Sequence, residues 1–169
     1  MKLTIGFSKP KNNKFPIFSW LIRLCQKTNY SHVYVKWYSS GIDVNVLYEA
    51  GGTSVKFIGE KIYSKKIQPV HEYEVNIDKV TYKKLLHFCM SNAGVHYGIK
   101  QIIGIVLVEV FGLSKNPYSD GRNSQVCSEL VGYILEDVLG KDLNLDLDIA
   151  GPKAIKEYLD KQKDFNKVL

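Results

Sequence analysis

The sequence predicts an α+β fold, in a single domain over residues 1–169, and three observations favour it. The length of 169 residues is typical of one compact domain, and no internal repeat or Pro/Ser-rich linker divides the chain. Strand-like alternation comes mostly before residue 77 and helical periodicity mostly after it. Apolar residues make up 45% and charged residues 24%, a balance that excludes wholesale disorder.

The expected strands cover residues 32–38, 43–49, 55–58 and 67–76. The first two form a hairpin around a two-residue turn at Ser40-Gly41. This turn pairs Val33 with Tyr48, Val35 with Val46, and Trp37 with Val44, and it makes one face of the hairpin wholly apolar.

Five helices are expected. One amphipathic helix covers residues 15–26, with Pro16 in its first turn. Asp78 is expected to cap a helix that ends near residue 92 and is closed by Gly94. The segment 97–111 is apolar on nearly all sides and is expected to be a buried helix. The last two helices cover residues 124–139 and 152–161.

The hairpin also gives the first indication of chemistry. In the predicted register, His32 lies directly opposite Glu49 on the polar face, as Tyr34 lies opposite Leu47. An imidazole and a carboxylate at that separation could form a hydrogen bond, which would orient the ring and stabilise its charged form. The alternative is an incidental polar pair at the end of a sheet.

Cys127 is a candidate nucleophile. Ser124 is a suitable N-cap, which places Cys127 in the first turn of its helix, where exposed amide groups and the helix dipole favour a thiolate. Cys127 also begins an apolar stripe with Leu130, Ile134 and Val138. The alternative is therefore a small core residue.

Composition restricts the other classes of function. Three cysteines, no secretory signal and an apolar stretch over 99–113 that is too short to span a membrane predict a cytoplasmic protein with reduced thiols. The net charge of +6 is concentrated in residues 1–84, which favours either an anionic partner or a solvated lysine-rich surface. No nucleic-acid signature, metal-ligand spacing or phosphate-binding loop is present. We therefore expect no nucleic-acid partner, no metal and no cofactor.

Several motifs together resemble the circularly permuted NlpC-type papain-like cysteine hydrolases, which include YiiX-like proteins. They occur in the order that is typical of that family: residues 18–23 (Phe-Ser-Trp-Leu-Ile-Arg), 30–33 (Tyr-Ser-His-Val), 48–50 (Tyr-Glu-Ala), 127–131 (Cys-Ser-Glu-Leu-Val) and 151–152 (Gly-Pro). The resemblance covers roughly residues 15–160. Gly98 departs from it, because relatives often carry Asp after the tyrosine.

The resemblance implies a permuted papain-like fold in which a small antiparallel sheet, or half-barrel, packs against a helix that carries the nucleophile. It implies Cys127 as nucleophile, His32 as base and Glu49 as the residue that orients the imidazole. Tyr97 and Ser31 are candidates for binding the oxyanion or the substrate, beside the backbone amide of Cys127.

The implied activity is that of a phage or bacterial thiol hydrolase that cleaves an amide, in a cell-wall peptide or another peptide or isopeptide, or an ester. Two alternatives remain. One is a lipid acyltransferase or phospholipase related to lecithin–retinol acyltransferase, which the apolar segment 102–113 and the basic N-terminal half favour. The other is a non-catalytic binding module for an anionic partner.

Overall fold

A computed structural model describes residues 1–11 and 17–169, and its centre is a curled eight-stranded sheet that forms a half-barrel. The strands are β1 (Lys2–Pro10), β2 (His32–Ser39), β3 (Val44–Gly51), β4 (Ser54–Gly59), β5 (Ile67–Asn76), β6 (His96–Tyr97), β7 (Ser124–Gln125) and β8 (Asn166–Lys167). Their order in the sheet is β7-β6-β4-β3-β2-β1-β5-β8. All neighbours are antiparallel except β6 and β7. The expected α+β class is therefore confirmed.

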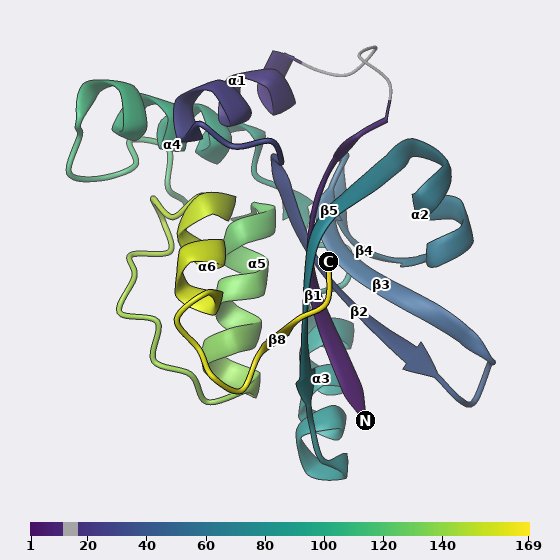
Figure 1. Ribbon diagram of the computed structural model, residues 1–169. Helices are drawn as coiled ribbons and strands as arrows, with labels where there is room; N and C mark the ends of the chain where they lie inside the picture. The colour runs from purple at the N-terminus through teal and green to yellow at the C-terminus, as the bar shows by residue number, and fades with distance from the viewer. Residues whose placement is uncertain (12–16) are drawn as a thin grey trace.

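Helices lie on both sides of this sheet. They are α1 (Ile17–Gln26), α2 (Glu60–Lys66), α3 (Lys79–Asn92), α4 (Ile99–Phe111), α5 (Cys127–Tyr133), which continues as a π-helical turn over Ile134–Val138, and α6 (Pro152–Leu159). Figure 1 shows α5 and α6 on one side of the sheet and α2 on the other, with α1 and α4 together at one end of the molecule. Within the described residues, no helix combines the length and the apolar character that crossing a membrane requires.

Alternation along the strands decides which side chains enter the core. Odd-numbered residues of β1 and β2, among them Phe7, Val33 and Trp37, are buried with the apolar side chains of α5 and α6. Even-numbered Tyr34 faces the other way and packs with Leu47 of β3 and Tyr63 of α2. Side chains from helices therefore pack against both faces of the central strands.

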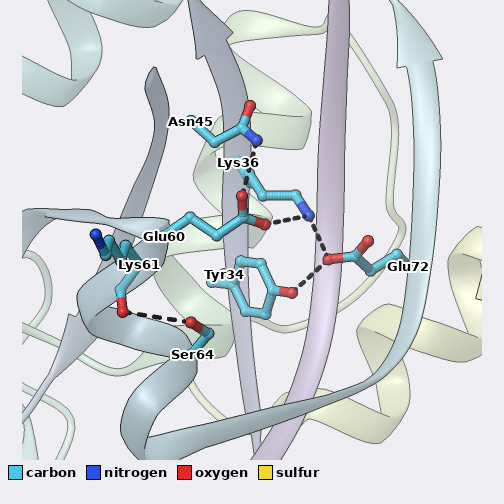
Figure 2. Close-up of polar contacts among 7 residues, drawn as sticks. All are labelled: Tyr34, Lys36, Asn45, Glu60, Lys61, Ser64 and Glu72. Atoms are coloured by element: carbon cyan, nitrogen blue, oxygen red, sulfur yellow. Dashed lines mark hydrogen bonds and ion pairs between the residues drawn. The ribbon is translucent and has the colours of Figure 1, made fainter. Parts of the chain in front are cut away.

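A polar network fixes α2 against the sheet (Figure 2). Lys36 Nζ on β2 donates hydrogen bonds to Glu60 Oε1 at 3.1 Å and to Glu72 Oε1 at 2.8 Å. Tyr34 donates to the same oxygen of Glu72 at 2.6 Å, and Asn45 donates to Glu60 Oε2 at 2.7 Å. Glu60 is the first residue of α2, so the network anchors the helix at its start.

The hairpin register differs from the prediction by two residues. Val35 pairs with Tyr48 and Trp37 with Val46, because residues 40–43 form a longer loop in which Asp43 has a left-handed φ of 53°. The prediction of a two-residue turn was therefore wrong. A slip of two residues keeps every side chain on its predicted face, so the apolar side of the hairpin is the predicted one.

The helix predictions are confirmed in part. Asp78 caps α3, accepting a hydrogen bond from the Thr81 amide at 2.7 Å. The predicted cap at Ser124 was wrong, because Ser124 belongs to β7 and α5 begins at Cys127 itself. The predicted helix 97–111 begins at Ile99, and only one side of it is buried. Residues 15 and 16 of the first predicted helix lie outside the described residues, and β1 and α2 were not predicted.

Candidate active site

The sheet brings His32 and Glu49 together. His32 is the first residue of β2, and its Nε2 lies 2.7 Å from Oε2 of Glu49 on β3. The two residues are diagonal neighbours, because the observed register, continued along the strands, places Gly51 opposite His32. A side chain at Gly51 would start within 3.5 Å of both the His32 ring and the Glu49 carboxylate. The absence of a side chain at Gly51 therefore leaves room for the two groups to meet.

Two cations hold Glu49 in its charged form. Its Oε2 meets His32, and its Oε1 lies 3.8 Å from Nζ of Lys56, the residue opposite Glu49 on β4. Burial raises the pKa of Glu49, but hydrogen bonding to His32 and the charges of His32 and Lys56 lower it below its ordinary value. Glu49 is therefore an ionised carboxylate next to the imidazole.

Cys127 is the other titratable residue that acts on the same imidazole. It is the first residue of α5, which packs on β2 and β3. Burial lowers the pKa of His32, but the charge of Cys127, hydrogen bonding to Cys127 and the contact with Glu49 raise it to about 10. Because Nε2 is engaged with Glu49, Nδ1 is the ring nitrogen available to the sulfur. A thiol and a carboxylate thus both act on one imidazole, and these are the three groups required to activate a cysteine nucleophile.

The β6–β7 pairing positions the start of α5. β7 ends at Gln125, and its parallel pairing with β6 attaches the segment before Cys127 to the sheet. Glu129, two residues after Cys127, returns its carboxylate to the end of this segment, where Oε2 accepts a hydrogen bond from the Val126 amide at 3.0 Å. This contact satisfies one of the free amide groups before the first turn, so Glu129 fixes the backbone on which Cys127 is carried.

Glu129 is fully buried, and its second oxygen has no hydrogen-bond partner among the described residues. Burial raises the pKa of Glu129 to about 8, against the opposing effect of the Val126 amide. Glu129 is thus neutral at pH 7 and has a structural role next to the candidate nucleophile. The sequence showed Glu129 only as part of a motif. Its spacing of three residues from Val126 is the signal that indicates the contact.

Tyr63 is a second residue near the site that the sequence did not indicate. Its hydroxyl lies 2.8 Å from Ser8 Oγ, and Ser8 pairs with His32 across β1 and β2. Burial raises the pKa of Tyr63 well above its usual range, and the charges of Glu49 and Cys127 add to this effect. Tyr63 therefore borders the site from α2.

The two predicted oxyanion or substrate residues differ in position. Burial raises the pKa of Tyr97 well above its usual range, and the charges of Cys127 and Glu49 raise it further. The hydroxyl of Ser31 is buried and lies 2.6 Å from Ser19 Oγ of α1. Ser31 therefore connects α1 to the start of β2, while Tyr97 is the one of the two that is affected by the charges of Cys127 and Glu49.

The other cysteines have different surroundings. Cys89 on α3 is fully buried in the core, and burial raises its pKa to about 12. Cys25 is partly exposed on α1. A hollow of about 610 Å³ between α3, Arg122 and the π-helical turn is lined by none of the three residues of the site. The grouping of a cysteine with His32 and Glu49 therefore singles out Cys127 among the three thiols.

Comparison with known proteins identifies the fold. No protein-family model and no curated protein matches the sequence. A crystal structure described as the metalloprotein yiiX from Escherichia coli O157:H7, DUF1105, matches with a TM-score of 0.64 and 16% identity, over 98% of this chain and 94% of that chain. The chain has a YiiX-like fold. At 16% identity the likeness to yiiX establishes the fold only, so the chemistry of this chain has to be argued from its own residues.

The description of yiiX as a metalloprotein raises the question whether this chain has a site for a metal ion. Residues 1–11 and 17–169 contain no group of three or more His, Cys, Asp or Glu side chains that could hold one. In the site, His32 Nε2 is hydrogen-bonded to Glu49 Oε2 at 2.7 Å and is therefore not free to bind a metal ion. The residues present therefore do not fit a metal centre.

Proposed function

We propose that the protein is a cysteine hydrolase with a permuted papain-like arrangement, in which Cys127 is the nucleophile, His32 the general base and acid, and Glu49 the residue that orients His32. The observation that carries the proposal is the bond of 2.7 Å between His32 Nε2 and Glu49 Oε2, with the same imidazole next to Cys127 at the start of α5. Such a series is the minimum required for acyl transfer through a thiol.

The steps follow from the positions of the three residues. The Cys127 thiolate attacks the carbonyl carbon of an amide or ester, and the resulting oxyanion collapses to expel the leaving group. His32, charged at neutral pH, donates its proton to the departing nitrogen or oxygen, which leaves an acyl thioester on Cys127. Water then attacks the thioester and gives one proton to His32. The products are a carboxylic acid and the regenerated thiolate–imidazolium pair.

Glu49 supports both proton transfers without exchanging a proton itself. Its carboxylate is ionised and accepts a hydrogen bond from the imidazolium, so it stabilises the charged ring and fixes its orientation. The backbone amide of Cys127 and the hydroxyl of Tyr97, which is affected by the charge of Cys127, are the candidate donors to the oxyanion.

Two substrate classes fit this chemistry. An amide, in a cell-wall peptide or another peptide or isopeptide, is the first. An ester or lipid acyl group is the second, and the exposed apolar side chains of α1 and α4 favour it. Both proceed through the same acyl-enzyme.

The experiment that tests the proposal detects the acyl-enzyme. The full chain is incubated with p-nitrophenyl acetate, followed by intact-mass analysis and peptide mapping. We expect one acetyl group on Cys127 and catalytic release of nitrophenol, both abolished in Cys127→Ala and kept in the matched control Cys89→Ala. Stoichiometric acetylation without turnover, or turnover that survives in Cys127→Ala, would contradict the proposal.

A further inference from the structure

Two apolar stripes face outward on α1 and α4. On α1, Ile17, Trp20 and Leu24 have helical spacing and are 79%, 57% and 57% exposed. On α4 and just after it, the exposed apolar residues are Ile99, Ile103, Val110, Phe111 and Leu113. Scattered exposed apolar residues are normal on a soluble protein, but a concentration of large ones on two neighbouring helices marks an interaction surface.

The two helices already use their other sides for packing. Ile22 of α1 is buried against Ile102 and Ile105 of α4, together with Val126, the residue before Cys127. Each helix therefore has an inner face in the protein and an outer face that no other described element covers.

Gln26 fixes the pair to the rest of the molecule. Its Nε2 donates to Glu109 Oε1 on α4 at 3.3 Å, and its Oε1 accepts a hydrogen bond from the Lys153 amide at the start of α6 at 3.1 Å. Gly151, just before α6, leaves the space that the Gln26 amide occupies. The α1–α4 pair is thus anchored at one end of the molecule, which Figure 1 shows.

The charges around the two stripes indicate what covers them. Residues 17–27 and 99–115 contain four basic side chains, Arg23, Lys27, Lys100 and Lys115. Their only acidic residue, Glu109, is the one bonded to Gln26. Helices that expose apolar side chains and an aromatic ring, and that carry basic residues with little opposing negative charge, match the interface of an anionic bilayer, where apolar side chains enter the acyl boundary and basic ones meet the headgroups.

We infer that the exposed apolar side chains of the α1–α4 end of the molecule, Ile17, Trp20 and Leu24 on α1 and Val110 and Phe111 on α4, dock on the surface of an anionic lipid membrane. Docking there places the end of the molecule that holds Val126 and the start of α5 toward the bilayer. The inference concerns binding alone and does not depend on whether Cys127 is catalytic.

Vesicle binding by the full chain tests the inference. We expect sedimentation with vesicles of phosphatidylglycerol and phosphatidylcholine at low salt, weaker binding to pure phosphatidylcholine, and loss of binding as salt rises. Trp20 is exposed and Trp37 is 3% exposed, so brominated lipids should quench Trp20 alone. Quenching should disappear in Trp20→Phe.

Two double variants test the two stripes separately. Trp20→Ser/Leu24→Ser on α1 and Val110→Ser/Phe111→Ser on α4 should each lower the vesicle partition coefficient about tenfold or more, because each removes two apolar side chains from the interface. The matched control is Ile62→Ser/Met90→Ser, which removes apolar residues that are 60% and 68% exposed on α2 and α3. The control should bind like the unchanged protein.

Three results would overturn the inference. They are absence of binding to anionic vesicles at low salt, binding that the stripe variants and the control alter equally, and a dimer in solution that the stripe variants dissociate, which would assign the face to a second copy. Alkylation of Cys127 by iodoacetamide is measured on every variant. It should be unchanged, so loss of membrane binding is distinguished from failure of the proposed active site.

Discussion

Glu129→Gln tests the description of the buried carboxyl group next to Cys127. In the folded protein the pKa of Glu129 is about 8, against an ordinary value of 4.5, so folding favours the protonated form. Its contribution to stability is therefore fully present below pH 4.5 and is lost as the pH rises through about 8. Glutamine is nearly the same size and stays neutral, so the variant should not show this loss.

The magnitude follows from the window between the two pKa values. Each pH unit inside it changes the free energy of unfolding by about 1.4 kcal/mol, so between pH 5 and pH 7 the natural protein should lose about 3 kcal/mol relative to Glu129→Gln. The glutamine oxygen can still accept the hydrogen bond from the Val126 amide, which keeps the start of α5 in place.

Urea unfolding at pH 5, 6, 7 and 8 measures this difference directly. Glu157→Gln, at a side chain that is 59% exposed on α6, is the control for removing one carboxylate. If the curves of Glu129→Gln and the natural protein run parallel from pH 5 to pH 8, Glu129 is not the buried neutral group described above. If Glu129→Gln instead loses stability relative to the natural protein as the pH rises, the direction assigned to the Glu129 pKa shift is wrong.

Three further outcomes are expected. Glu49→Gln should lower the pKa of His32 and reduce activity at neutral pH less than removal of His32 does, as NMR titration and a pH–rate profile would show; an unshifted profile would exclude Glu49 from the site. His32→Ala should leave the fold intact, as circular dichroism would report, and lower turnover about 10²-fold or more, and undiminished turnover would mean that His32 carries no proton. Gly6→Ala should destabilise the protein by roughly 2 kcal/mol in urea unfolding, because its new methyl group would start 2.2 Å from the Tyr34 ring, and an unchanged midpoint would contradict that packing.

The sequence alone predicted that His32 and Glu49 lie on the same face of the sheet, although the predicted turn was too short. Alternation determines faces, and a slip of two residues preserves them, so the pair survives as diagonal neighbours. The exact register depends on the loop over residues 40–43, where Asp43 adopts a left-handed conformation. Residues 39–44 contain no Asn-Gly or Asp-Gly pair that would indicate the type of turn.

The start of the cysteine helix depends on contacts that the local sequence does not show. Ser124 looked like a cap, but its pairing with His96 in the sheet takes it out of the helix, so Cys127 is the first helical residue. The buried carboxylate of Glu129 caps the helix instead, by accepting a hydrogen bond from the Val126 amide. Tertiary pairing outweighs the local propensity of serine at this position.

The elements that were not predicted have weak or misleading signals. β1 has the alternating residues Leu3, Ile5 and Phe7, but its central place in the sheet follows only from its pairing with β2 and β5. α2 is a seven-residue polar helix with one buried side chain, Tyr63. The composition of residues 97–111 predicted burial on all sides, whereas the structure leaves one side of α4 exposed beside α1.

The proposed active site depends most directly on the pairing of Cys127 with His32, and the pH profile of iodoacetamide alkylation tests this pairing. Cys127 and Cys89 are 4% and 0% exposed, so burial alone predicts that both react slowly. If His32 stabilises the Cys127 thiolate, Cys127 is the fastest of the three thiols, its alkylation rate persists down to about pH 6, and His32→Ala removes this persistence. If Cys127 alkylates as slowly as Cys89, or if its profile is the same without His32, the thiol is a core residue and the proposed site is wrong.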